Sequence, residues 1–326
     1  MIKGNEKIHI VACADNNFVM PTGVMMQSVC VNNPDVDIVF HVIHDDSVTS
    51  KDRKNLEETI APFEGKMLVF YDVDVTKFPG FPNIKKGIGV TQAAYYRLML
   101  SEILPKNIHK VLYLDGDIIV RHSLLPLWNT DMKGHPVGVV NYPYEVFPKL
   151  YIPLDYPPQL GYFNSGVMLI DLAYWRKHEV VKVFFCIIRE YPQKLRFWDQ
   201  DVLNIAFSEN KIELPMKYNL TTGFLRKIPQ WDNDKYKKEV EEARRDPVIV
   251  HYTKNKPWDA YQRHPNHPFQ STFYHYQDQT KWKGMKIDRR PMKLRIINFV
   301  ADMLRKYGLK SPITEKYDFV DLAPID

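Results

Sequence analysis

The stretch KVLYLDGDIIVRHSL, residues 110–124, places two carboxylates inside an otherwise apolar run. Residues 111–114 read as a strand that is buried on both faces, and residues 118–120 resume the apolar pattern. Asp115 and Asp117 stand between them, separated by Gly116. Two carboxylates this close repel each other in a partly dry site, whereas a shared divalent cation makes them ligands. We therefore expect both aspartates at the strand's end, in a crevice, with a metal ion.

The short spacing alone leaves a second interpretation open. Asp115 and Asp117 could lie in a turn where both are solvated, or could cap a following helix. Gly116 fits a turn, and it also permits a ligand to approach the backbone closely.

Strand-like and helix-like segments alternate around this stretch. Strand-like runs are expected at residues 8–14, 37–46 and 66–74, and helical ones at 23–33, 50–63 and 91–104. This alternation predicts an α/β fold with a mostly parallel central sheet and helices on both faces. In such sheets ligands bind beyond the carboxyl ends of the strands, where the strand order reverses.

The later part of the chain is less regular. Strands are expected at residues 135–142, 161–172 and 247–254, and helices at 180–191 and 199–208. From about residue 265 the pattern gives way to aromatic and basic sequence. We therefore divide the chain into a catalytic domain, residues 1–265, and a C-terminal extension, residues 266–326.

His251 follows the last predicted strand, so it too should emerge at a strand end. Beside Asp115 and Asp117 it would complete a mixed oxygen and nitrogen ligand set, which suits Mn²⁺ better than Mg²⁺, and both better than Ca²⁺. Lys256 is then placed to assist a phosphate. The alternative is that His251 is a polar residue whose hydrogen bonds are satisfied within the fold.

Six sequence blocks occur in the order and spacing of a known family. They are ADNNF (14–18), YYRLML (95–100), VLYLDGDIIVRHSLLPLWNTDM (111–132), YFNSGVMLIDLAYWRKH (162–178), WDQDVLN (198–204) and HYTKNKPW (251–258). Through these blocks the sequence resembles glycosyltransferase family 8, especially its bacterial lipopolysaccharide glucosyl- and galactosyltransferases. The resemblance implies a GT-A fold and retaining transfer of a hexose from UDP-glucose or UDP-galactose to a glycan or lipid-linked saccharide.

The resemblance also implies roles for individual residues. Asp115, Asp117 and His251 match the Mn²⁺ ligands, and Gln200 matches a residue proposed to face the anomeric carbon. The other positions that the resemblance assigns to the nucleotide-sugar site are Cys13, Asp15, Asn17, Arg97, Gly116, Asn164, Ser165, Asp199 and Lys256. Asp15 and Asn17 match uridine contacts, Arg97 an arginine beside the donor sugar and the catalytic aspartates, and Lys256 a diphosphate contact.

Two blocks depart from the family pattern. HYTKNKPW is one residue shorter than the usual HYxGxxKPW and lacks its glycine, which puts the geometry of residues 254–256 in question. Asn141 and Tyr142 stand where the family often has an acidic residue that contacts the sugar or the acceptor, so acceptor preference should differ.

Each motif has a structural alternative as well. Asp15 and Asn17 could form an Asx turn, and Gly166 could serve a bulge inside a strand. Asp199 could be a helix N-cap, and Arg97 an ion-pair partner. Trp198 and Trp258 are expected to pack rather than to stack on a sugar.

The expected mechanism depends on how the anomeric carbon of the donor sugar is attacked. A covalent retaining route needs a carboxylate nucleophile, and Gln200 is a poor nucleophile. We therefore favour attack on the face from which UDP departs, with Asp201 as the reserve nucleophile. The resemblance implies that Asp199 contacts a hydroxyl of the donor sugar. Two other functions stay open: a metal-dependent phosphotransferase or nucleotidyltransferase, and a non-catalytic module that binds sugar nucleotides.

The positive charge of the chain is concentrated in its tail. The whole chain carries +5, whereas residues 281–310 hold ten Lys/Arg and two Asp, so the remainder is acidic. Residues 296–307 have an apolar helical face with basic flanks, which fits an anionic membrane surface or packing onto the catalytic domain. No nucleic-acid-binding motif accompanies the charge, so a nucleic-acid partner is not expected.

The sequence also bears on where the protein acts. No signal peptide is recognised, and no run of about 18 apolar residues predicts a membrane span. Cys13, Cys30 and Cys186 are odd in number, widely spaced and in apolar surroundings, so we expect buried thiols in a reducing compartment. We therefore expect a cytoplasmic protein, with peripheral contact to the inner face of the cell membrane through the tail.

Overall fold

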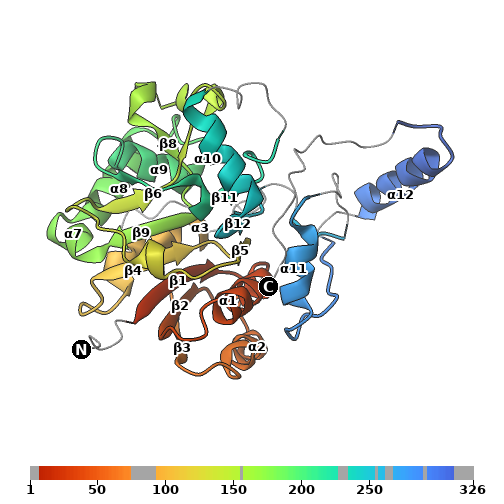
Figure 1. Ribbon diagram of the computed structural model, residues 1–326, viewed down its shortest axis with the longest axis horizontal. Coiled ribbons are helices and arrows are strands. Elements are labelled where there is room, and N and C mark those ends of the chain that lie inside the picture. The colour runs from red at the N-terminus through yellow and green to blue at the C-terminus, as the bar shows by residue number, and fades with distance from the viewer. Residues whose placement is uncertain are drawn as a thin grey trace.

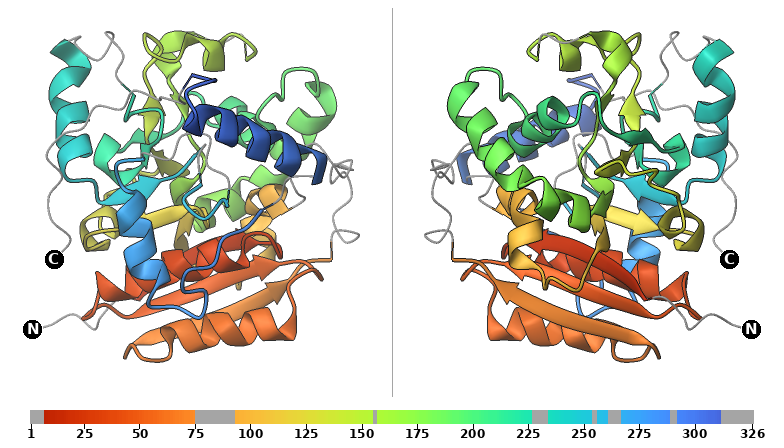
Figure 2. Two further views of the ribbon diagram at one scale, coloured as in Figure 1. Left: turned by 90° about the vertical axis from the view of Figure 1, so that its right-hand side faces the viewer. Right: turned by 90° about the vertical axis from the view of Figure 1, so that its left-hand side faces the viewer.

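The computed structural model describes residues 7–74, 93–154, 157–226, 234–253, 256–260, 267–288 and 292–311. A large mixed sheet forms the centre of the molecule, and helices cover both of its faces (Figures 1 and 2). The predicted α/β architecture is confirmed.

The central sheet has seven strands in the order β10-β6-β9-β4-β1-β2-β3. Its strands are β1 (Ile8–Ala14), β2 (Ile38–His44), β3 (Lys66–Asp72), β4 (Lys110–Leu114), β6 (Val137–Val139), β9 (Val167–Asp171) and β10 (Ile212–Glu213). All neighbours pair in parallel except β9, which is antiparallel to β4 and β6. The strand order reverses between β1 and β4, because β2 and β3 extend the sheet to one side of β1 and β4 lies on the other.

Alternate residues of the inner strands face two separate apolar clusters. In β4, Leu112 and Leu114 join one cluster, whereas Val111 and Tyr113 join the other. Helices α1 (Val19–Val31), α2 (Ser50–Ile60), α5 (Leu125–Trp128), α10 (Asp234–Arg245) and α11 (Gln270–Gln277) contribute to the first cluster. Helices α3 (Ala93–Tyr96), α4 (Leu100–Ile103), α7 (Leu172–Lys177), α8 (Val180–Glu190) and α9 (Trp198–Ala206) contribute to the second. The strand at 111–114 is therefore buried on both faces, as predicted.

The apolar run that resumes after Asp117 belongs to a different sheet. Strand β5 (Ile118–Val120) pairs antiparallel with β12 (Ile249–His251), which pairs in parallel with β11 (Leu220–Thr221). The chain therefore leaves the central sheet at Asp115 and enters a three-stranded sheet one residue after Asp117.

Three predicted elements are divided in the structure. The helical segment expected at 91–104 consists, in its described part, of α3, a 3-10 turn at Arg97–Met99 and α4. The strands expected at 135–142 and 161–172 each divide into two shorter strands. Of these, β7 (Asn141–Tyr142) and β8 (Tyr162–Phe163) pair with each other as a separate two-stranded sheet. A further short helix, α6 (Pro148–Tyr151), lies between β7 and β8 in sequence.

The C-terminal extension divides into a packed part and a projecting part. Phe269, Phe273 and Tyr276 belong to the first apolar cluster, and Tyr276 Oη accepts a hydrogen bond at 2.7 Å from Asn32, the C-cap residue of α1. Helix α12 (Met292–Lys306) instead stands away from the body of the molecule (Figure 1). The expected domain boundary at residue 265 lies outside the described residues.

Two expectations about the chain as a whole can be compared with the structure. In the described part of the chain, no helix combines the length and the apolar character needed to cross a membrane. The expectation of three buried thiols is wrong for Cys186, because α8 turns that residue to solvent, while Cys13 and Cys30 are buried.

Candidate functional site

The candidate site lies at the carboxyl ends of β1 and β4, where the strand order reverses. Asp115 and Asp117 occupy the turn from β4 into β5, and His251 is the last residue of β12. Because β5 and β12 are antiparallel, His251 pairs directly with Ile118. The Tyr252 N–H also donates to the Asp117 carbonyl at 3.0 Å. Strand pairing thus brings together residues that are more than 130 positions apart in sequence.

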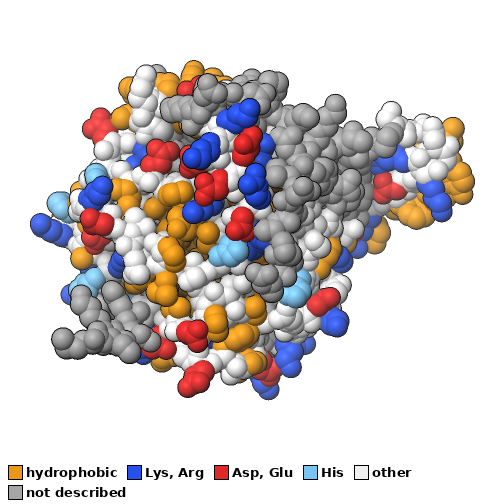
Figure 3. All heavy atoms as spheres, viewed as in Figure 1, with side chains coloured by type: hydrophobic (Ala, Val, Ile, Leu, Met, Phe, Trp, Pro, Cys, Tyr) orange, Lys and Arg blue, Asp and Glu red, His pale blue; other side chains and the backbone are white. Residues whose placement is uncertain are grey.

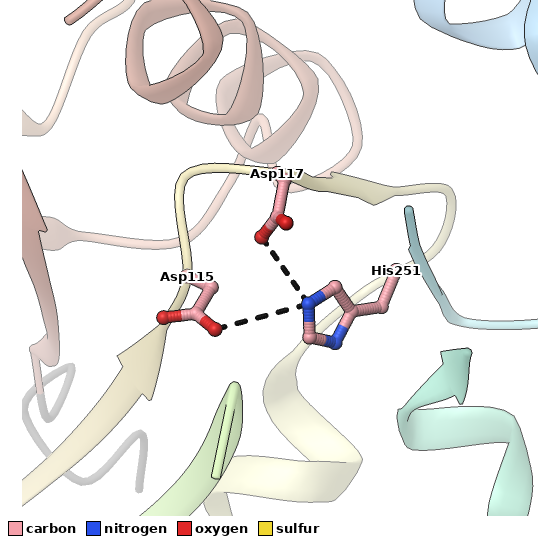
Figure 4. Close-up of side chains that lie close together, drawn as sticks. All are labelled: Asp115, Asp117 and His251. Atoms are coloured by element: carbon pink, nitrogen blue, oxygen red, sulfur yellow. Dashed lines mark ion pairs between the residues drawn. The ribbon is translucent and has the colours of Figure 1, made fainter. Parts of the chain in front are cut away.

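Asp115, Asp117 and His251 point toward one another (Figure 4). His251 Nε2 lies 3.2 Å from Asp117 Oδ1 and 3.8 Å from Asp115 Oδ2. The three ligand atoms all lie within 4.8 Å of one another, which is close enough to share one cation.

Each of the three residues has its other polar atom held by the protein. Asp115 Oδ1 accepts from Arg97 Nη2 and from Tyr113 Oη, both at 2.9 Å. Asp117 Oδ2 is paired with the Lys256 ammonium. His251 Nδ1 lies 2.9 Å from Asn219 Oδ1. One oxygen of each carboxylate and one ring nitrogen therefore stay directed at a common point.

This donor set fits a divalent cation of the Mg²⁺ or Mn²⁺ type. Two carboxylate oxygens and one imidazole nitrogen are ligands that these ions accept, and contacts that orient each ligand are typical of metal sites. Burial acts to raise the pKa of Asp117, but Lys256 and His251 outweigh it and hold the pKa below its ordinary value. The carboxylate is therefore ionised at neutral pH, as a ligand must be.

Arg97 connects the candidate metal site, through Asp115, with a third carboxylate, that of Asp199. Its Nε lies 3.0 Å from Asp199 Oδ2, and its Nη1 donates to the carbonyl and hydroxyl oxygens of Ser165 at 3.1 and 3.2 Å. Burial acts to lower the pKa of Arg97, but Asp115 and Asp199 outweigh it and hold the pKa well above its ordinary value. Burial raises the pKa of Asp199 to about 6, although Arg97 opposes the shift. The ion pairs that the structural alternative gave to Arg97 are present.

The first turn of α9 supplies the next group of side chains. The chain enters this helix through Trp198, whose φ of 48° lies in the left-handed region, where a non-glycine residue is strained. Asp201 Oδ1 accepts from Tyr162 Oη at 2.8 Å, and its Oδ2 accepts from the Phe197 N–H at 2.5 Å. The N-cap position of α9 is Phe197, so Asp199 lies inside the helix and is not its N-cap.

Amide side chains connect α9 with the histidine. Gln200 Oε1 accepts from Asn164 Nδ2 at 2.9 Å and from the Ser165 N–H at 3.2 Å, and Gln200 Nε2 donates to Tyr162 Oη at 2.7 Å. Asn164 Oδ1 in turn accepts from Asn219 Nδ2 at 3.0 Å. The hydrogen bonds thus run from Asp201 to His251 without a break.

Two glycines have different neighbours at the site. A Cβ on Gly166 would lie 2.2 Å from His251 Cε1 and 2.6 Å from Asp115 Oδ2, so only glycine leaves the site its present shape. A Cβ on Gly116 would lie 2.6 Å from Thr22 Oγ1 of α1. On that side, the space that Gly116 leaves is taken by α1 rather than by a ligand.

The family model described as "Glycosyl transferase family 8" matches residues 9–262, which is more than half of the chain. The chain belongs to glycosyltransferase family 8.

Individual relatives agree with this assignment. General stress protein A of Bacillus subtilis (strain 168) is 29% identical over 289 residues, covering 86% of this chain and 96% of that protein. Lipopolysaccharide 1,2-glucosyltransferase of Escherichia coli (strain K12) is 25% identical over 270 residues, covering 81% of this chain and 77% of that protein. Among solved structures, the galactosyltransferase LgtC in complex with donor and acceptor sugar analogs superimposes with a TM-score of 0.72 at 26% identity, covering 88% and 99% of the two chains. This likeness supports the GT-A fold.

The shortened HYTKNKPW segment of this family 8 glycosyltransferase still brings its ends to the site. His251 reaches both aspartates, and Lys256 reaches Asp117. Lys254 lies outside the described residues. The missing residue and glycine therefore do not remove the histidine from the cluster.

The β1 end of the site contains the other predicted nucleotide contacts. Asp15 is buried, and its Oδ1 accepts from the N–H groups of Asn17 and Phe18 at 2.9 and 3.1 Å, which is the Asx turn of the structural alternative. Asn17 is exposed at this turn. Burial raises the pKa of the Cys13 thiol to about 12, so this side chain is a neutral group beneath the site.

Two further predicted positions are explained by packing. Tyr142 is buried against Phe147 and Phe224, with ring centroids 4.7 and 5.2 Å apart, while Asn141 is half-buried beside it. Trp258 is fully buried and packs on Phe273 at 5.0 Å, as expected.

Sequence reasoning missed three contacts of the site. Asn219 orients His251, Tyr113 holds Asp115, and Tyr162 holds Asp201. Tyr113 had one available signal, since it precedes Asp115 by two positions in a strand and therefore lies on the same face. A lone asparagine before a two-residue strand carries no comparable signal.

Proposed function

We propose that this family 8 glycosyltransferase transfers glucose or galactose from the UDP-sugar to a hydroxyl of a glycan, with retention of configuration and with Mn²⁺ as its metal. The observation that carries the proposal is the cluster of Asp115, Asp117 and His251, in which each residue presents one ligand atom and has its other polar atom held. The named activities of the relatives support a hexose donor and favour lipopolysaccharide or another cell-surface glycan as acceptor.

The metal would be held by Asp115, Asp117 and His251. When bound, it supplies a Lewis acid that stabilises charge on the departing diphosphate. Lys256 adds a second positive charge beside Asp117, where the diphosphate would lie. We assign the remaining donor contacts to Cys13, Asp15, Asn17, Arg97, Gly116, Asn164, Ser165, Asp199 and Gln200.

The contacts of the α9 residues favour attack on the face from which UDP leaves. Both Gln200 Oε1 lone pairs are directed at N–H donors, and both Asp201 oxygens accept from protein donors. Gln200 carries an amide, which is a poor nucleophile, and Asp201 is held through both of its oxygens by Tyr162 and Phe197. The acceptor hydroxyl would therefore form the new bond to the anomeric carbon as the bond to UDP breaks, and its proton would pass to a phosphate oxygen of the departing UDP.

A UDP-release assay tests this function. Intact protein with MnCl₂ and either UDP-glucose or UDP-galactose should release UDP, faster with a glycan acceptor present, and chelation should stop it. A phosphotransferase or nucleotidyltransferase would release phosphate or pyrophosphate instead. A non-catalytic module would bind UDP without release. Absence of both UDP binding and donor turnover at millimolar MnCl₂ contradicts the proposal.

Replacing Gln200 with alanine tests whether this side chain positions the groups around the donor sugar or contributes to UDP binding. The substitution removes the amide that fixes Asn164 and Tyr162 around the donor sugar, so we expect transfer to fall about tenfold to a hundredfold. The dissociation constant of UDP with Mn²⁺ should change little, because Gln200 does not contact the metal-type cluster directly. Undiminished transfer would remove Gln200 from any role in the reaction.

We also propose that α12 attaches the enzyme to an anionic membrane surface. Nearly all apolar side chains of α12 are exposed, among them Ile296 at 59% and Phe299 at 67%. Of the residues of this helix that the structure describes, Ala301 alone is buried. Figure 3 shows these apolar side chains next to basic ones on the projecting helix. An apolar face of this extent with lysine and arginine around it fits the interface of anionic lipids.

Vesicle sedimentation tests the attachment. The protein should sediment with phosphatidylglycerol vesicles and not with phosphatidylcholine vesicles, and Phe299→Ser with Ile296→Ser should reduce the bound fraction severalfold. UDP release with a soluble acceptor should stay unchanged, because both side chains are exposed and neither belongs to the residues assigned to the site. Equal binding to both vesicle types would rule out the charge-dependent attachment.

A further inference from the structure

We infer that Asn219 is a positioning residue that fixes the tautomer of His251 and directs Nε2 of this ring at Asp115 and Asp117. The inference rests on the metal site of the proposed function. Asn219 itself has no contact with either aspartate among the described hydrogen bonds, so it would act through the histidine alone.

Strand pairing places Asn219 beside the ring. It directly precedes β11, whose Thr221 pairs with His251 of β12. The Asn219 side chain is 1% exposed, and its Oδ1 lies 2.9 Å from His251 Nδ1. An amide oxygen can only accept, so the proton of this hydrogen bond belongs to Nδ1.

The neighbouring amide decides which end of Asn219 faces the ring. Asn164 Oδ1 accepts from the Gly166 N–H at 3.1 Å, which identifies that atom as the oxygen. The same atom receives Asn219 Nδ2 at 3.0 Å, so the remaining end of Asn219, toward His251, is its oxygen. A reversed Asn219 would set its oxygen against Asn164 Oδ1, with no proton between the two atoms.

The consequence is that the lone pair available for a cation lies on Nε2. Metal-ligating histidines commonly donate their other ring N–H to an acceptor, and loss of that acceptor typically lowers metal affinity tenfold to a hundredfold. The ring also has little freedom to turn, because Gly166 lies against its Cε1. Asn219 thus supplies the acceptor that the buried Nδ1–H requires.

A calorimetric titration of the intact protein with MnCl₂ alone tests the inference. Asn219→Ala should weaken Mn²⁺ binding by about tenfold to a hundredfold. Asn219→Asp keeps an acceptor of the same size toward Nδ1–H, although it sets an oxygen against Asn164 Oδ1 in place of the Nδ2 donor, so it should lose less than about tenfold in Mn²⁺ affinity. This second variant also decides the question if Asn219→Ala does not fold.

A matched control exists elsewhere in the chain. Asn210 Oδ1 lies 2.6 Å from His135 Nδ1, which is the same kind of pair outside the site. Asn210→Ala should leave Mn²⁺ binding unchanged. If Asn219→Ala binds Mn²⁺ like the wild type, or if Asn219→Asp loses about tenfold or more in Mn²⁺ affinity, the inference is overturned and the metal site stands. A wild type that does not bind Mn²⁺ overturns the proposed metal site itself.

Discussion

Asp117→Asn is expected to reduce Mn²⁺-dependent UDP release by at least about a thousandfold, because a metal ion contributes several kcal/mol to such a reaction and each 1.36 kcal/mol is a factor of ten. The amide removes the charge of the more buried of the two carboxylates and one charged contact of the Lys256 ammonium. Initial rates of UDP release over a range of MnCl₂ concentrations measure the effect, and a calorimetric titration measures the loss of Mn²⁺ affinity.

The same change on an exposed helix is the control. Asp302 of α12 pairs with Arg305 at 2.6 Å, and its side chain is 50% exposed. Asp302→Asn should leave UDP release with a soluble acceptor within a factor of two of the wild type, on the order expected for surface substitutions. If Asp117→Asn folds like the wild type by circular dichroism and keeps its activity at saturating MnCl₂, the assignment of Asp117 as a ligand is wrong.

The sequence predicted those parts of the fold that periodicity determines. Strand β1 and the buried strand at 111–114 were expected at residues that the structure confirms, because both faces of an inner strand need apolar residues. The same pattern could not reveal that residues 118–120 leave the central sheet. An apolar run reads alike in either sheet, and only the pairing of β5 with β12 decides which one it joins.

The sequence predicted those residues of the candidate site whose charge, or position at a strand end, needs an explanation. Two close carboxylates in an apolar run, and a histidine at another strand end, are brought together by the structure. The polar residues behind them carried no such signal. Asn219 and Tyr162 act through side-chain hydrogen bonds between elements distant in sequence, and their partners become visible only once the strands are paired.

Arg97→Met is expected to lower the free energy of unfolding by about 3 kcal/mol or more, because removal of one partner of a buried ion pair leaves unpaired charge in the interior. Arg97 is 8% exposed and contacts Asp115 at 2.9 Å and Asp199 at 3.0 Å, so two carboxylates lose their cation. Urea unfolding at neutral pH measures the loss. Arg189→Met on α8, where the side chain is 74% exposed beside Glu190, should change stability by no more than about 0.5 kcal/mol.

The loss caused by Arg97→Met should also depend on pH. Burial raises the pKa of Asp199 to about 6, and removing Arg97, which lowers it, raises this pKa further. A carboxyl whose folded-state pKa is raised contributes stability below its unfolded pKa, and this stability is lost as pH rises through the folded-state value. The variant should therefore lie closest to the wild type near pH 4 to 5 and fall further behind as pH rises through 6 and above. A deficit that is constant from pH 5 to pH 8 would mean that Asp199 does not depend on Arg97 for its charge.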